Sequence, residues 1–206
     1  MIKDCTAIIL AGGDSQRMGQ DKARLLLGGQ TLLQRVAGTM QQVFPQTIVS
    51  VRQPRPEINL PQVCDEPAEN GQQGGAGPLA GLAAGLAHVT TPWAFVVACD
   101  MPFVEAAMVE LLAKSRSGYQ AVVPVVQGHQ QPLAAYYATA CLGVIRAHLA
   151  GSGRNSLRAI LEQLQVRYVD ESELLAADPG LRSFFDLDTP ADVASVMKND
   201  TENNDY

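Results

Sequence analysis

Residues 6–22 read TAIILAGGDSQRMGQDK, and the fold follows from how this stretch is interpreted. The short apolar, β-branched run at residues 6–10 indicates a buried strand of a parallel sheet. After one alanine come two adjacent glycines, Gly12 and Gly13, and Arg17 and Lys22 add positive charge. Glycines let a backbone approach a ligand closely and present its N–H groups to phosphate or base atoms. Since ligands of such sheets lie beyond the carboxyl ends of the strands, we expect a ligand-binding loop here; the alternative is a tight turn with surface cations.

Strands and helices alternate along the rest of the chain. Apolar runs predict further strands at residues 47–51, 62–64, 93–98, 121–126, 133–137 and 166–169. Helices are predicted at residues 32–43, 79–89, 104–114, 137–149, 156–164 and 191–198. Thr31 and Gln34 have the spacing of a capping box before the first of these helices. The alternation predicts an α/β fold with a doubly wound, mostly parallel sheet and helices on both faces. We expect one domain over residues 1–198 and a tail without fixed structure at 199–206.

Composition limits the classes of protein to which the chain can belong. It has 206 residues, 47% of them hydrophobic, which is enough for one domain with a sizeable core. The formal net charge of -6 argues against a nucleic-acid-binding protein. A local cluster of cations can still hold a small anion in an acidic protein.

The cysteines are far apart and form no CxxC pair, which argues against a zinc site or a disulfide framework; they are Cys5, Cys64, Cys99 and Cys141. We expect reduced and mostly buried thiols. The sequence lacks a signal-peptide pattern at its start. It also lacks an apolar run near the ~20 residues that a membrane span needs. We therefore expect a cytoplasmic protein without a membrane partner.

Carboxylates near the predicted strand ends are candidate metal ligands. Asp100 lies at the end of the strand at 93–98, where a single carboxylate suits Mg²⁺, which completes its shell with water and phosphates. The alternative is an aspartate that caps a turn. Asp186 and Asp188 alternate, so in a strand they would point to the same face and complete the metal site. The alternative for this pair is that both complement the dipole of the following helix.

Further candidates lie in loops. Asp65 begins the glycine-rich segment 65–78, which we expect to be a mobile surface loop. His129 lies in an expected loop where it could contact a substrate, whereas His88 and His148 lie in predicted helices and are expected to be structural. A phosphate-sized backbone cradle, nearby cations and metal-competent carboxylates are together the groups needed to act on a nucleoside triphosphate.

The glycine loop, together with further motifs along the chain, resembles the pattern of a known family. LAGGDSQRMGQDK at 10–22 is similar to the signature LAGGxSxRMGxDK of the molybdenum cofactor guanylyltransferases (MobA), within the nucleotidyltransferase superfamily. The resemblance covers almost the whole chain, because further motifs follow in the family's order: GPLAGLAAGL at 77–86, CDMPF at 99–103, QPLAAYY at 131–137, SLRAIL at 156–161 and FFDLDTPADV at 184–193.

This resemblance implies a Rossmann-like nucleotidyltransferase fold and an activity. GMP would be transferred from GTP to the terminal phosphate of molybdopterin with Mg²⁺, releasing pyrophosphate. Molybdoenzyme maturation proteins are implied as candidate partners. The guanine and sugar would be held by Leu10, Ala11, Gly12 and Gly13. Lys22 and Arg17 would contact the phosphates, Asp65 and Ser50 would contact the nucleotide, and Asp100 would bind both the nucleotide and Mg²⁺, with Asp188 as a second metal ligand. Gln131 and Pro132 resemble part of the molybdopterin side.

Two departures from the family pattern bear on the substrate. Ser50 stands where the family often has asparagine, and DLDTP at 186–190 stands where many guanylyltransferases have NxNTP. Aspartates there also occur in cytidylyl relatives, but those usually have AAG instead of LAGG and lack GPLAG. The sequence therefore favours guanylyl transfer. The alternatives are a molybdenum cofactor cytidylyltransferase, another small-phosphate nucleotidyltransferase, and a non-catalytic nucleotide- or cofactor-binding protein. Retention of both Lys22 and Asp100 argues against the last.

Overall fold

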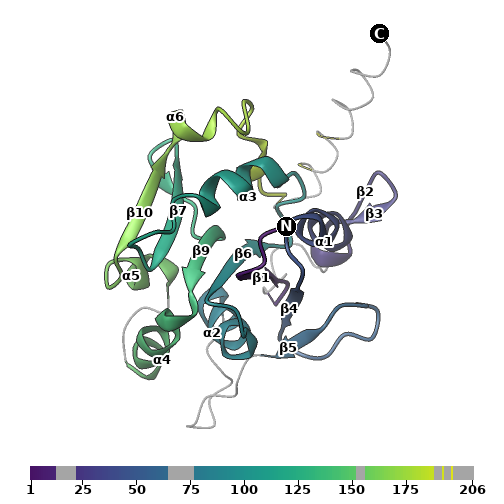
Figure 1. The fold of residues 1–206 in the computed structure, drawn as a ribbon. Helices are drawn as coiled ribbons and strands as arrows, with labels where there is room; N and C mark the ends of the chain where they lie inside the picture. Colours follow the sequence, from purple (N-terminus) through teal and green to yellow (C-terminus); the bar gives the residue numbers. More distant parts are fainter. Residues whose placement is uncertain (13–21, 65–76, 152–155, 188–191, 193–195, 197–206) are drawn as a thin grey trace.

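The computed structural model describes residues 1–12, 22–64, 77–151, 156–187, 192 and 196. Its centre is a mixed sheet with the strand order β10-β7-β9-β6-β1-β4-β5 (Figure 1). These strands are β1 (Cys5–Leu10), β4 (Thr47–Val51), β5 (Gln62–Cys64), β6 (Trp93–Ala98), β7 (Ala121–Val126), β9 (Ala134–Ala138) and β10 (Val166–Asp170). Residues 65–76 of the loop expected at 65–78, most of the last predicted helix and the tail at 199–206 lie outside the described residues, and Pro78 already begins a helix.

The predicted, mostly parallel character of the sheet is confirmed; the antiparallel strands are β9 in its centre and the short β8 (His129–Gln130), which pairs with β7. β1 pairs in parallel with β4 and β6, β4 with β5, and β7 with β10. β9 runs antiparallel to both of its neighbours, β6 and β7. The strands β1, β4, β6 and β7 therefore end on the same side of the sheet, which we call the carboxyl edge. Their first residues lie at the opposite side, the amino edge.

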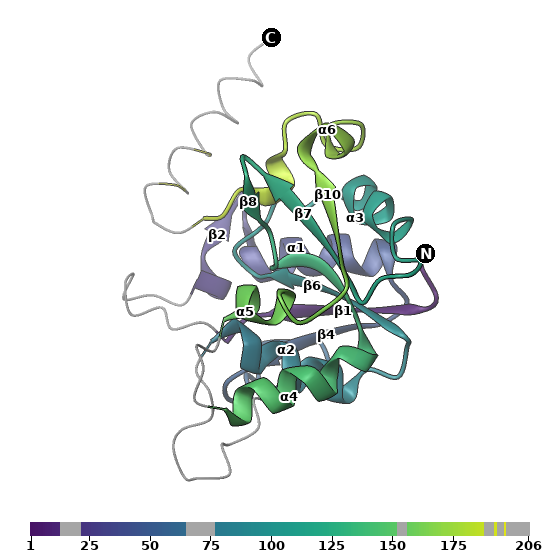
Figure 2. The same cartoon turned by 90° about the vertical axis from the view of Figure 1, so that its left-hand side faces the viewer.

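Helices cover both faces of the sheet, as predicted. One face carries α1 (Leu32–Val43), α3 (Ala106–Ala113) and the short α6 (Glu171–Leu174), whose apolar side chains share a core with the sheet. The other face carries α2 (Pro78–His88), α4 (Leu142–Ala150) and α5 (Leu157–Leu161). Figure 2 shows the two groups on opposite sides of the strands. The sheet is thus doubly wound. Because the helices pack on its two faces, its carboxyl and amino edges remain available for other contacts.

Local sequence explains why two of these helices lie where they do. The predicted capping box opens α1: the Gln34 N–H donates to Thr31 Oγ1 at 3.1 Å, and the Thr31 N–H donates to Gln34 Oε1 at 2.9 Å. The small residues of α2 let it lie close to β1. A Cβ atom at Gly85 would stand 2.7 Å from Ile8 Cγ2, so only glycine permits this approach.

The helix predicted at residues 137–149 begins later than expected. Tyr137 belongs to β9, where it pairs with Ala94 of β6 and Ala121 of β7, and α4 starts only at Leu142. Tyr137 is fully buried, and its hydroxyl donates to the Pro132 carbonyl at 2.9 Å. Cross-strand pairing and burial therefore override the local helical pattern. The helices expected at 104–114 and 156–164 are likewise shorter, and the strand at 133–137 is shifted by one residue.

Two short hairpins were not predicted. β2 (Leu26–Leu27) and β3 (Gln30–Thr31) pair across Gly28 and Gly29, whose φ values of 58° and 80° fit a tight hairpin turn. β8 (His129–Gln130) folds back on β7 through Gln127 and Gly128. In both cases the two turn residues include a glycine. Such a pair between two short strand-like runs is a sequence signal for a hairpin. The consequence for His129 is that it lies in a strand, not in the loop where it was expected.

The cysteine prediction is confirmed. None of the four cysteines forms a disulfide; Cys5, Cys99 and Cys141 are buried and Cys64 is half-buried. Burial raises the pKa of the Cys5 thiol to about 12 and that of Cys141 to about 11, so these side chains are unreactive core residues. None of the helices in the described ranges is long and apolar enough to cross a membrane.

The Arg116 side chain makes several contacts at the amino edge of the sheet. The Arg116 guanidinium lies 5.6 Å from the centre of the Trp93 ring and 5.4 Å from that of Tyr136. It also donates to Asp4 Oδ1 at 3.2 Å and to the Ala113 carbonyl at 2.9 Å. These contacts join the segments before β1, after α3 and at the start of β6. They stabilise the fold at the side of the sheet that lies away from the glycine loop.

Candidate nucleotidyl-transfer site

The start of the glycine loop is fixed between two strands at the carboxyl edge. The Ala11 N–H donates to the Ser50 carbonyl of β4 at 2.9 Å, and the Cys99 N–H donates to the Leu10 carbonyl of β1 at 3.1 Å. Ser50 itself is 1% exposed, so the contact that the structure gives it with the loop is through its backbone. The backbone of residues 10–12 is therefore rigidly placed for a ligand beyond the strands.

Gly12 lies against a cation that the sequence analysis did not single out. A Cβ atom at Gly12 would stand 3.4 Å from both the backbone nitrogen and Cγ of Arg52. Arg52 is the first residue after β4, and Gly12 is the second residue after β1. A cation directly after a predicted strand on the ligand side of the sheet was the signal that could have identified Arg52.

The structure brings Lys22 and Asp100 together. Lys22 Nζ lies 3.0 Å from Asp100 Oδ2, although the two residues are 78 positions apart in sequence. Lys22 opens the 3₁₀ turn η2 (Lys22–Arg24), and Asp100 lies in a turn two residues beyond Ala98, the last residue of β6. The two side chains are 25% and 20% exposed, so the pair is accessible to a ligand but not fully solvated.

The segment after Lys22 is held by a second set of charges. Glu57, in the loop after β4, accepts from Arg24 Nη2 at 2.7 Å and from Arg55 Nε at 3.1 Å. The hydrogen bond from Arg24 is the main reason why the pKa of the Glu57 carboxyl falls to about 2. Glu57 therefore links η2 to the loop after β4 through Arg24 and Arg55.

The described residues before Asp188 do not form the strand that would align its side chain with that of Asp186. Residues 185–187 have no strand conformation, and Asp186 is exposed. Leu187 is buried instead, and its N–H donates to the Asp100 carbonyl at 2.9 Å. The chain at this point is fixed by that bond and by burial of Leu187, not by sheet pairing. Asp188 lies outside the described residues, as do Gly13, Arg17 and Asp65.

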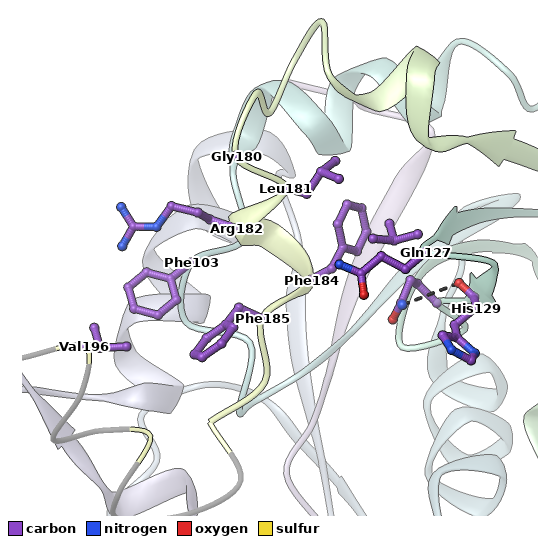
Figure 3. A pocket seen from close by; sticks show the side chains of 11 residues that line it. Phe103, Gln127, His129, Gly180, Leu181, Arg182, Phe184, Phe185 and Val196 are labelled. Atoms are coloured by element: carbon purple, nitrogen blue, oxygen red, sulfur yellow. Dashed lines mark hydrogen bonds between the residues drawn. The ribbon is translucent and has the colours of Figure 1, made fainter. Parts of the chain in front are cut away.

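A hollow of about 630 Å³ is lined in part by Phe103, which follows Asp100 by three residues in the sequence (Figure 3). Three chain segments wall it: the turn after Asp100, the β7–β8 hairpin, and residues 180–185. The described residues that line it are Phe103, Val126, Gln127, His129, Gln131, Gly180, Leu181, Arg182, Phe184, Phe185 and Val196. His129 and Gln131 were singled out from the sequence, and both lie here. The aromatic and arginine side chains of the wall were missed, because nothing local marks residues 182–185 as facing Phe103.

The donor set at the carboxyl edge fits Mg²⁺. Within the described ranges, no three His, Cys, Asp or Glu side chains gather as a cage for a metal ion. Mg²⁺ needs no such cage, because it is commonly held by one or two carboxylates together with substrate phosphates. Asp100 is a carboxylate of this kind, partly exposed and beside a lysine that suits phosphate.

Comparison with known protein families gives a match over most of the chain. Residues 7–169 match the family model described as "MobA-like NTP transferase domain". A "Probable molybdenum cofactor guanylyltransferase" of Pelotomaculum thermopropionicum is 35% identical over 193 residues, which is 93% of this chain and 91% of the relative. A "Molybdenum cofactor guanylyltransferase" of Desulfosudis oleivorans is 34% identical over 186 residues, or 89% of this chain and 90% of the relative.

Solved structures agree with this match. "Molybdopterin-guanine dinucleotide biosynthesis protein A" from Archaeoglobus fulgidus superposes with a TM-score of 0.81 and 26% identity, over 98% of this chain and 100% of that one. A 2-C-methyl-D-erythritol 4-phosphate cytidylyltransferase from Thermus thermophilus superposes with a TM-score of 0.66 over 94% of this chain and 97% of that one. At 18% identity the second likeness concerns the fold alone.

Proposed function

This chain belongs to the MobA-like NTP transferase family, and on that premise we propose that it transfers GMP from GTP to the terminal phosphate of molybdopterin. The observation that carries the proposal is the Lys22–Asp100 pair, 3.0 Å apart, at the edge where the glycine loop begins. It joins a phosphate-binding cation to a metal-competent carboxylate beside a backbone cradle. The reaction would take place in the cytoplasm, and molybdoenzyme maturation proteins would receive the product.

The chemistry needs charge control more than an activated nucleophile. An oxygen of the molybdopterin phosphate attacks the α-phosphorus of GTP in line. A new phosphorus–oxygen bond forms, and the bond from the α-phosphorus to the oxygen that bridges to the β-phosphorus breaks. Pyrophosphate leaves with the electron pair of that bond. Repulsion between the anionic reactants is the barrier, so cations that face the phosphates accelerate the step.

Each described residue has a distinct part in this proposal. The backbone of Leu10, Ala11 and Gly12 would hold the guanine and ribose, and Ser50 would keep that backbone in place. Lys22 would bind the phosphates and Asp100 would hold Mg²⁺, which when bound neutralises charge on the triphosphate. Arg17 on the phosphates, Gly13 and Asp65 on the nucleotide, and Asp188 on the metal complete the proposed site.

The test is pyrophosphate release by the purified protein with Mg²⁺, molybdopterin and either GTP or CTP. We expect release with GTP and molybdopterin together, little with CTP, and none without the acceptor or after chelation of the metal. Preference for CTP would overturn the guanylyl assignment in favour of a cytidylyltransferase. GTP binding without pyrophosphate release would overturn the enzyme in favour of a binding protein.

A further inference from the structure

Arg52 is an exposed cation at the carboxyl edge of the sheet. It is the first residue after β4, whose last two residues, Ser50 and Val51, are 1% and 0% exposed. Their side chains cannot reach a ligand beyond the strands, whereas that of Arg52 can. A Cβ atom at Gly12 would stand 3.4 Å from Arg52 Cγ, so the aliphatic stem of Arg52 lies against the bare backbone at the start of the glycine loop.

The strand order separates Arg52 from the proposed phosphate site. β1 lies between β4 and β6 in the sheet (Figure 1). Arg52 follows β4, and Asp100 lies two residues beyond the end of β6. Ser50 of β4 and Ala98 of β6 both pair with Leu10 of β1, so their backbones are about 10 Å apart. Arg52 and Asp100 therefore lie on opposite sides of the start of the glycine loop.

A nucleotide bound across this edge would bring its base to Arg52. On the proposed function, Lys22 and Asp100 face the phosphates, and the ribose of GTP separates those phosphates from the base. The backbone of Gly12, which we place at the ribose and guanine, lies between Asp100 and Arg52. Since Lys22 already supplies a cation at the phosphate end, 3.0 Å from Asp100, Arg52 is left for the other end of the nucleotide.

The chemistry of a guanidinium group distinguishes guanine from the other bases. Guanine presents two neighbouring acceptors, O6 and N7, and the planar fork of an arginine donates to both at once. Adenine carries an amino group in place of O6, so that two donors would face each other. Cytosine has an amino group and no N7. An arginine at the base therefore favours GTP over both ATP and CTP.

We propose that Arg52 is a specificity-determining residue that donates to the O6 and N7 atoms of the guanine of GTP. The proposal rests on the proposed function and deepens it, because it names a side chain that selects guanine over cytosine. It also bears on Ser50, which stands where the family often has asparagine and is buried. Arg52 supplies the exposed polar side chain at the end of β4 instead.

The test measures the Kd values of GTP, GMP and 7-deaza-GTP, which lacks the N7 acceptor, for the unchanged protein and for Arg52→Met. Methionine keeps an unbranched stem against Gly12 and removes the guanidinium. Loss of a bidentate contact to guanine should weaken GTP and GMP binding alike, by about 5- to 150-fold. The unchanged protein should prefer GTP to 7-deaza-GTP, and Arg52→Met should lose that preference. Equal losses for GTP and 7-deaza-GTP, or no loss, would overturn the proposal.

A second variant separates a contact with the base from a contact with the phosphates. Arg52→Lys keeps the positive charge, which is sufficient to bind a phosphate, but lacks the planar fork that matches two acceptors. We expect Arg52→Lys to lose nearly as much affinity for GTP as Arg52→Met. Normal GTP binding by Arg52→Lys, or a loss for GTP that GMP does not share, would assign Arg52 to the phosphates and overturn the proposal.

Lys3→Met is the matched control for the change in net charge. Lys3 is exposed and precedes β1 at the amino edge, so this variant should bind all three nucleotides normally. Equal weakening by Lys3→Met and Arg52→Met would show a general effect of charge and count against the proposal. Failure of the proposed function looks different: the unchanged protein would bind GTP in an Arg52-dependent way yet release no pyrophosphate from GTP and molybdopterin.

Discussion

Lys22 and Asp100 form a pair whose position matters more than its contribution to stability. Ion pairs with partial solvent exposure contribute only about 0–1 kcal/mol to folding. The side chains here are 25% and 20% exposed, so the fold does not depend on their attraction. On the proposed function Lys22 faces the phosphates and Asp100 holds Mg²⁺, so ligand chemistry explains the pair better than folding stability does.

Asp100→Ala and Lys22→Ala should each lower kcat by about 10²–10³, since loss of one group that stabilises transition-state charge costs about 2.7–4 kcal/mol. The unfolding midpoint in urea should change little. Asp4→Ala is the control, because it removes a carboxylate from the ion pair with Arg116 at the amino edge. It should leave kcat unchanged. Near-normal pyrophosphate release by Asp100→Ala at saturating Mg²⁺ would remove Asp100 from the metal role.

At the scale of elements, α2 and β1 are in unusually close contact. The Gly85 Cβ position lies 2.7 Å from Ile8 Cγ2, and Ile8 is completely buried. Because Ile8 is β-branched and packed, it cannot move away easily. α2 can therefore lie this close to β1, the strand before the glycine loop, only because residue 85 has no side chain.

Gly85→Ala should destabilise the protein, because overpacking costs about 1–3 kcal/mol and the higher helix propensity of alanine returns about 1. Gly38→Ala is the matched control: Gly38 lies within α1 and has no atom within 4 Å of its Cβ position. It should gain up to about 1 kcal/mol from propensity alone. Urea unfolding measures both. Equal shifts of the same sign would contradict the packing argument.

Asp178 connects elements through backbone donors and has a different expected signature. Asp178→Ala leaves the buried N–H of Ser183 without its partner, and that of Arg182 as well, at a cost of about 1–3 kcal/mol. Asp178→Asn keeps one acceptor oxygen and should lose less. Urea unfolding measures both variants. Equal losses of stability in Asp178→Ala and Asp178→Asn would contradict the hydrogen-bond argument.

Over the whole molecule, the sequence predicted the parallel part of the fold best. β1, β4 and β6 are continuous apolar runs bounded by turn residues, and a parallel strand buried on both faces requires that pattern. Tyr137 ended one predicted strand and began one predicted helix; it belongs to β9, and the helix begins only at Leu142, because the strand pairing that decides this depends on residues far away in the chain. The hairpin across Gly28 and Gly29 was missed although two adjacent glycines mark such a turn.

The candidate site, like the fold, was predicted only in part. Lys22 and Asp100 were predicted because each follows or flanks a strand, and the sheet topology then brings them together. Arg182 and Phe185 were not predicted, since their position depends on Asp178 and on the bond of Leu187 to Asp100, neither of which has a local sequence pattern. Strand ends can be read from one sequence, whereas contacts between loops cannot.

The cluster around Arg116 at the amino edge has an evolutionary consequence. β1 has six residues and spans about 20 Å between that edge and the glycine loop. Inherited changes at Trp93 or Arg116 are therefore expected to alter heat tolerance at a distance from the transferred phosphate. A lineage that enters a hotter or colder habitat can adjust one end of the sheet while selection for the nucleotide and its acceptor acts on the other.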